Sequence, residues 1–89
     1  MMFISDAKGM IAEACALDWL KEQFKGWEFR KTPEFLDRQG IDILGRKEDK
    51  VMKIQVKSSM KGVEEFKSDW RYDGEIKLVL VNGANVKMI

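Results

Sequence analysis

Residues 40–45 read Gly40-Ile41-Asp42-Ile43-Leu44-Gly45, and residues 54–59 read Ile54-Gln55-Val56-Lys57-Ser58-Ser59. In both stretches apolar residues alternate with others, a pattern typical of β-strands, and the charged run over 46–50 supplies a turn between them. Residues two apart in a strand share a face, so Gln55 and Lys57 point the same way. The sequence therefore predicts a hairpin in which Asp42 faces Gln55 and Lys57.

This hairpin gathers chemically useful groups at one place. A carboxylate, an amide oxygen and an ammonium together can hold a divalent cation and orient a water molecule. Asp42 lies between two isoleucines that are expected to be buried, and a carboxylate in such a strand needs a partner that offsets its desolvation. A solvent-facing side chain is a realistic interpretation of Lys57 alone, but less so opposite Asp42. Gln55 is the least specific of the three, because amides are common on half-exposed strand faces.

The pattern resembles the PD-(D/E)xK nuclease superfamily, in which an Asp begins one strand and an acid-x-Lys motif lies on the next. The resemblance covers about residues 6–82 and depends on Asp42, Gln55, Lys57 and Glu13. Glu13 precedes the hairpin on a predicted helix, where many members carry a further acidic ligand. Position 55 departs from the commonest pattern, which has Asp or Glu; Gln at this position is familiar from Mrr-like and type I restriction nuclease domains.

The resemblance implies an activity and a site. It implies a nuclease that hydrolyses DNA with Mg²⁺, or Mn²⁺ as a substitute, bound by Asp42, Glu13, Gln55 and the Val56 carbonyl. Lys57 would orient the attacking water or neutralise charge in the transition state. Small single-domain members resemble Holliday-junction resolvases and viral or phage repair nucleases, often homodimeric, which implies branched DNA as the substrate and a role in repair or recombination.

The rest of the chain predicts one small α/β domain over residues 1–89. A helix ends near Phe24, a strand covers 27–31, a polar connection covers 34–39, a helix covers 61–70, and a strand buried on both faces covers 76–81. Asn82-Gly83 is a tight-turn signal, so 85–88 is an optional edge strand. The apolar stripe of the first helix comprises Ile11, Ala14, Cys15, Leu17 and Leu20. The apolar stripe of the second helix comprises Val63, Phe66 and Trp70. This αβββαβ order is the common core of the restriction-endonuclease-like fold, with a mixed central sheet flanked by helices.

Composition limits the class of protein. A chain of 89 residues forms one domain with a modest core, so a homodimer is a reasonable expectation. No apolar run approaches the roughly 20 residues that span a bilayer, and no signal-peptide layout is present. Cys15 is the only cysteine and histidine is absent, which excludes an internal disulfide and argues against zinc sites and histidine triads. We expect an intracellular protein, cytoplasmic or in the host-cell cytoplasm if viral, without a membrane partner or small-molecule cofactor.

Charge is unevenly distributed along the chain. Residues 25–61 carry ten Lys or Arg against six acids, whereas 1–24 carry two against four and 62–89 carry four against five. The basic surplus around the hairpin suits a polyanion, but from charge alone a solvated surface of mixed charge is the preferred interpretation. Glu13 is also open to two interpretations, a metal ligand or a boundary residue facing water. Asp37 lies in a predicted loop, where turn chemistry is the preferred interpretation.

Three functions remain open. The first is the metal-dependent nuclease. The second is a DNA-binding module of the same fold with weak or absent catalysis, which Gln55 motivates because an amide holds Mg²⁺ without charge. The third is a small α/β interaction protein in which the Asp and Gln-x-Lys pattern is coincidental.

Overall fold

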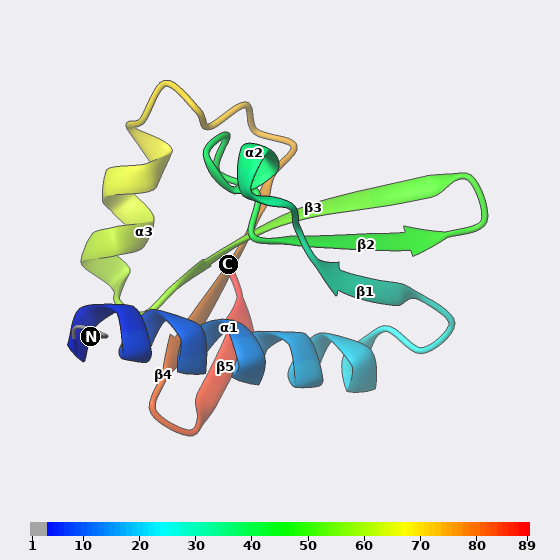
Figure 1. The fold of residues 1–89 in the computed structure, drawn as a ribbon, viewed down its shortest axis with the longest axis horizontal. Helices are drawn as coiled ribbons and strands as arrows, with labels where there is room; N and C mark the ends of the chain where they lie inside the picture. Colours follow the sequence, from blue (N-terminus) through cyan, green and yellow to red (C-terminus); the bar gives the residue numbers. More distant parts are fainter. Residues whose placement is uncertain (1–3) are drawn as a thin grey trace.

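A computed structural model describes residues 4–89, with side-chain surroundings from Ile11 onward, Glu34 excepted. The elements along the chain (Figure 1) are α1 (Ile4–Gln23), β1 (Glu28–Lys31), α2 (Glu34–Asp37), β2 (Ile43–Lys47), β3 (Lys50–Lys57), α3 (Met60–Lys67), β4 (Lys77–Asn82) and β5 (Asn85–Met88). The strands form one mixed sheet in the order β1-β2-β3-β4-β5. Only the β3–β4 pairing is parallel, because α3 carries the chain back to the same end of the sheet.

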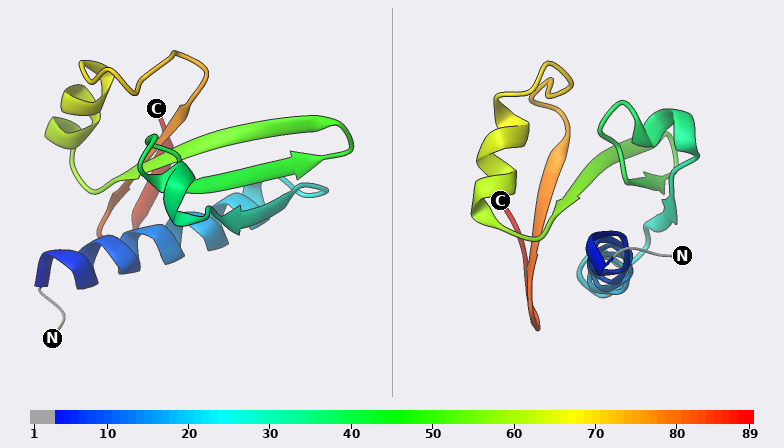
Figure 2. Two further views of the ribbon diagram at one scale, coloured as in Figure 1. Left: turned by 45° about the horizontal axis from the view of Figure 1, so that its top comes forward. Right: turned by 60° about the vertical axis from the view of Figure 1, so that its left-hand side comes forward.

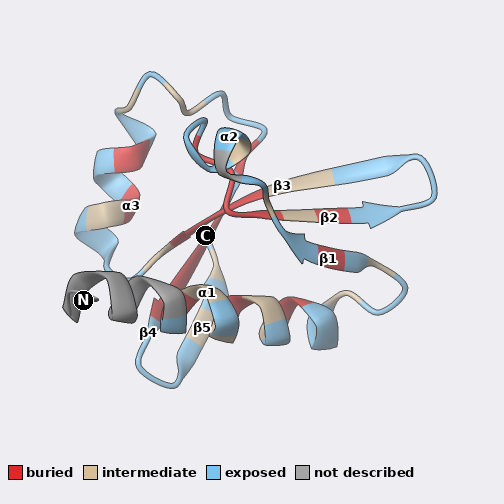
Figure 3. Cartoon of the chain, viewed as in Figure 1, coloured by how far each residue is buried: buried red, intermediate tan, exposed pale blue. Residues whose placement is uncertain are grey.

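The predicted hairpin forms, but its strands are longer at the turn than expected. β2 continues to Lys47 and β3 begins at Lys50, which leaves only Glu48 and Asp49 between them instead of the whole charged run. Glu48 adopts a φ of 56°, the left-handed conformation that tight hairpin turns require. Charged side chains tolerate this position because the hairpin end is exposed to water (Figure 3).

Two hydrophobic cores lie on opposite faces of the sheet. On one face α1 contributes Ala12, Ala16 and Leu20, which pack with Phe29, Ile43, Ile54, Val56, Val79 and Val81. On the other face α3 contributes Val63 and Phe66, which pack with Ile41, Ile76, Leu78 and Leu80. Figure 2 shows α1 and α3 on the two sides of the strands. β4 supplies alternate residues to both cores, which confirms the predicted strand with two buried faces.

The buried face of α1 differs from the predicted stripe. Ala12 and Ala16 are buried, whereas Ile11 is 65% exposed and Ala14 is exposed. Apolar residues occur around much of this helix, so spacing alone did not identify the face that packs. The small alanines let the helix approach the sheet closely, and this close approach selects their face.

Two further predictions need correction. The polar connection over 34–39 contains a short helix, α2, instead of being wholly irregular. The second predicted helix, α3, ends at Lys67 and so does not reach Trp70, a residue that is 85% exposed. Ser68 stops the helix by capping it, with its N–H bonded to the carbonyls of Glu65 and Phe66.

None of the helices in the described part of the chain is long and apolar enough to cross a bilayer.

Candidate metal site at the start of β2

Asp42 immediately precedes β2, and its backbone is held from both sides. Its N–H donates to the Ile54 carbonyl at 2.8 Å, and its carbonyl accepts from the Thr32 N–H at 3.1 Å. Its carboxylate then accepts a hydrogen bond from the Val56 N–H, with Oδ2 2.9 Å from the nitrogen. The side chain thereby supplies the acceptor that a further residue of β2 would otherwise provide, and it lies where β2 and β3 separate.

Two other carboxylates meet Asp42 there. Glu13 comes from α1 and Asp37 from the end of α2, and one carboxylate oxygen from each of the three residues lies within 4.8 Å of the other two. Glu13 also pairs with Lys31 of β1, with Oε2 3.4 Å from Nζ. We call Glu13, Asp37 and Asp42 the carboxylate cluster.

A tight turn brings Asp37 back to Asp42. The Gly40 N–H donates to the Asp37 carbonyl at 3.0 Å, and the Ile41 N–H donates to the Leu36 carbonyl at 3.1 Å. Gly40 adopts a φ of 84°, which favours glycine, and a Cβ there would lie 2.6 Å from Cζ of Phe66. The turn therefore requires glycine at position 40, because the backbone there packs directly against Phe66 of α3 and leaves no room for a side chain.

Electrostatics in the cluster favour the neutral form of Asp42. Burial raises the pKa of this carboxyl from 3.8 to about 8, and a side-chain hydrogen bond with Asp37 and the negative charge of Glu13 act in the same direction. The Val56 N–H opposes the shift because it stabilises the carboxylate. Three acids so close together are stabilised by a proton or a cation between them.

Gln55 is buried on the face of the sheet that packs against α3. In β3–β4 register it is the partner of Leu78, and only 7% of the residue is exposed. Its Oε1 is buried and accepts no hydrogen bond within the described part of the chain. A buried carbonyl oxygen without a hydrogen bond destabilises the folded protein, so a ligand at this atom would offset the loss.

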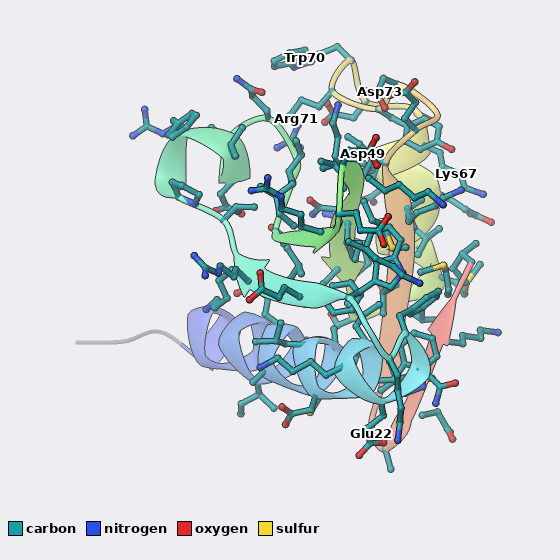
Figure 4. The ribbon with its side chains drawn as sticks, turned by 90° about the vertical axis from the view of Figure 1, so that its right-hand side faces the viewer. Glu22, Asp49, Lys67, Trp70, Arg71 and Asp73 are labelled. Carbon is teal, nitrogen blue, oxygen red and sulfur yellow. The ribbon has the colours of Figure 1, made fainter. Side chains whose placement is uncertain are left out.

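Two cations lie against the Phe66 ring on the α3 side of the sheet. Nζ of Lys57 lies 5.3 Å from the centre of the Phe66 ring, and the Arg71 guanidinium lies 5.5 Å from the same centre. Arg71 also interacts electrostatically with Asp42 and Asp37. Asp69 holds this guanidinium with two bonds of 3.0 Å, and the Arg71 contacts lower the pKa of Asp69 to about 2. Figure 4 shows Arg71 below the outward-pointing Trp70.

The structure therefore brings together some of the predicted residues. Asp42 and Glu13 meet directly. Gln55 lies one residue before the Val56 amide that contacts Asp42, and Lys57 lies over Phe66. Asp37, a possible accessory acid in the sequence, was assigned to turn chemistry, and Arg71 was not singled out, since both lie in segments that read as turns. The closest sequence signal was Asp37 shortly before Gly40, where a reversal of the chain can return the acid to Asp42.

No protein-family model, curated protein or solved structure matches this chain. The site is therefore characterised by its own donor set. The three carboxylates are hard oxygen donors of the kind that Mg²⁺ and Mn²⁺ prefer. These residues fit a divalent cation, and no thiolate or imidazole lies in the carboxylate cluster.

Proposed function

We propose that this protein is a metal-dependent nuclease that hydrolyses phosphodiester bonds in DNA. The observation that carries the proposal is the carboxylate cluster, which draws one acid from each of α1, α2 and the start of β2. The element order supports it: with the short α2 and the terminal β5 set aside, α1, β1, β2, β3, α3 and β4 follow one another as the sequence resemblance leads us to expect. Because one fold can host many functions, the proposal depends on the oxygen donors of the site and not on the order of the elements.

The roles divide between metal ligands and cations. Asp42, Glu13 and Asp37 would hold Mg²⁺, with Gln55 Oε1 and the Val56 carbonyl as further oxygen donors. When bound, Mg²⁺ would polarise the scissile phosphate and lower the pKa of a coordinated water.

Lys57 would neutralise charge that develops on the phosphate, and its Nζ lies 5.3 Å from the centre of the Phe66 ring. Arg71 is held by Asp69, so it contributes a fixed positive charge beside the cluster.

Cleavage assays on linear, flapped and four-way DNA with Mg²⁺ or Mn²⁺ test this activity. We expect Asp42→Asn, Asp37→Asn and Glu13→Gln each to lower the rate about 100-fold or more, because metal ions supply several kcal/mol of transition-state stabilisation. Glu22→Gln is the matched control for Glu13→Gln, since it removes an exposed acid from the same helix. Equal rates in Glu13→Gln and Glu22→Gln would remove Glu13 from the site.

Asparagine is the informative replacement for Asp42. Its amide oxygen can still accept the Val56 N–H, whereas alanine would leave that buried donor unpaired and destabilise the sheet. Activity lost in Asp42→Asn with an unchanged unfolding midpoint at acidic pH therefore reports on metal binding and not on folding.

A second function, a DNA-binding module with little catalysis, is favoured by Gln55. The superfamily pattern has a charged ligand at this position, and an amide contributes no charge to hold the cation. DNA binding without cleavage of any of the three DNA forms, with either metal, would select this second function. Absence of both metal and DNA binding would select a small interaction protein instead.

A further inference from the structure

The face of the hairpin that points away from α1 carries a set of cations. Strand register places Glu28 opposite Arg46, Arg30 opposite Leu44, Arg46 opposite Val51 and Leu44 opposite Lys53. Residues paired in this way point to the same side of the sheet. Gln55 and Lys57 continue this side along β3. We call it the open hairpin face, and its charged residues are Glu28, Arg30, Arg46, Lys53 and Lys57.

No helix covers the outer part of this face among residues 4–89. α1 packs on the opposite side, against β1, β3, β4 and β5, and α3 packs against β3 and β4. Figure 1 and Figure 2 show the hairpin extending beyond both long helices. A shallow groove follows the face between Arg30, Leu44, Arg46 and Val51, and Val51 is 61% exposed.

The charge on this face is complementary to a phosphate backbone. The face carries four basic residues and one acid: Arg30, Arg46, Lys53, Lys57 and Glu28. A second acid, Asp49, lines the groove at the turn of the hairpin. Strand geometry separates Lys53 from Lys57 by about 13 Å and Arg30 from Lys53 by roughly 10 Å. Side chains of this length can reach successive phosphates from such positions.

We infer that the open hairpin face binds the sugar–phosphate backbone of a DNA duplex arm that leads to the carboxylate cluster. The inference rests on the proposed function for the choice of nucleic acid as the ligand. The open hairpin face leads to the carboxylate cluster through Phe66. Lys57, at the inner end of the face, and Arg71 both lie over the Phe66 ring. Arg71 in turn interacts with Asp42 and Asp37. Four of the ten basic residues of 25–61 therefore lie on this one surface.

The salt dependence of DNA binding tests this surface. Fluorescence anisotropy with a labelled duplex, between roughly 50 and 200 mM salt, gives the slope of log K against log salt. Ca²⁺ replaces Mg²⁺, and a gel checks that the duplex stays intact. We expect Lys53→Gln and Arg46→Gln each to reduce the slope by about 0.9, the contribution of one neutralised phosphate.

Lys47→Gln is the matched control. Lys47 follows Arg46 in the same strand but points to the α1 side, where its Cε would lie 3.8 Å from a Cβ at Gly26. Its removal takes the same charge from the hairpin, and we expect the slope to stay unchanged. Thermal unfolding checks that all three variants are folded.

The outcomes separate this inference from the nuclease proposal. Equal slope changes in Lys53→Gln and Lys47→Gln would overturn the inference even if the wild type cleaves DNA. Slope changes confined to Lys53→Gln and Arg46→Gln would support it even if no cleavage is found. A changed sedimentation coefficient with an unchanged slope would overturn it by assigning the face to a second copy of the chain.

Discussion

Asp42 combines two tasks that usually fall to different residues. Its carboxyl group pairs with the Val56 N–H within the sheet and also belongs to the carboxylate cluster. The residue is only 8% exposed, so its charged form is disfavoured unless a cation is present. This conflict between burial and charge predicts how the free energy of unfolding responds to pH.

The pKa of Asp42 is raised from 3.8 to about 8 in the folded protein. Between these values the folded protein keeps a proton that the unfolded chain releases, so stability is lost as pH rises from about 4 to about 8 in the absence of metal. The loss approaches 1.4 kcal/mol per pH unit for one proton. Urea unfolding across this range should show the decline in the wild type and a flatter profile in Asp42→Asn. Parallel profiles would contradict it.

Gln55 supports a second prediction at the level of one residue. Gln55→Glu places a carboxylate where only 7% of the residue is exposed, so the metal-free protein should be less stable at neutral pH. If residue 55 is a ligand, the added charge should strengthen Mg²⁺ binding, and Mg²⁺ should raise the unfolding temperature more than in the wild type.

Gln39→Glu provides the control, because Gln39 is exposed in the turn before Gly40. It adds the same charge without the burial. An unchanged Mg²⁺ affinity in Gln55→Glu, measured by calorimetry, would remove residue 55 from the ligand set.

Individual site residues were predictable where their immediate neighbours revealed the environment. Ile41 and Ile43 are buried as expected, and the acid between them is buried too. Asp37 was not predictable in this way. Its place beside Asp42 depends on the left-handed Gly40 and on the contact of Gly40 with Phe66, and the sequence neighbours of Asp37 do not contain this information.

At the scale of elements, the spacing of apolar residues predicted the strands, whose sides alternate residue by residue. The two-sided burial of β4 follows from its nearly continuous apolar run, and the hairpin follows from alternation. The packing face of α1 was not predictable, since Ile11 and Ala12 are both apolar and either could have been the buried residue. Close packing against the sheet favours the smaller residue, and that choice is made only when the elements meet.

The contact between the α2–β2 turn and α3 yields a prediction with an internal control. Gly40→Ala should destabilise the protein more than Gly74→Ala, although both glycines have similar φ values of 84° and 80°. A Cβ at Gly40 would lie 2.6 Å from Phe66, whereas none of the described atoms lies within 4 Å of a Cβ at Gly74. The excess loss should be about 1–3 kcal/mol, the range for overpacked cores. Equal losses in urea unfolding would contradict the contact.

At the scale of the whole molecule, the surface bears on self-association. Large apolar side chains are exposed at several described positions: Ile11, Phe35, Val51, Met60, Trp70 and Ile89. A domain of 89 residues buries a limited fraction of its own surface, so pairing with a second copy would stabilise it.

We propose a homodimer, which would also present two sites for cutting two strands. Sedimentation velocity over a range of concentrations should show a dimer, and Trp70→Ala should weaken it at least tenfold if this exposed indole is an anchor. A monomer at every concentration would contradict the proposal.

The carboxylate cluster joins three separate parts of the chain, with Glu13 on α1, Asp37 on α2 and Asp42 immediately before β2. A cation held by all three would act as a reversible cross-link, because α1 could not detach from the sheet without releasing it. Amide hydrogen exchange in α1 and β2 should then slow together when Mg²⁺ is added. Metal occupancy would thus be measurable as a coupled slowing of exchange in α1 and β2.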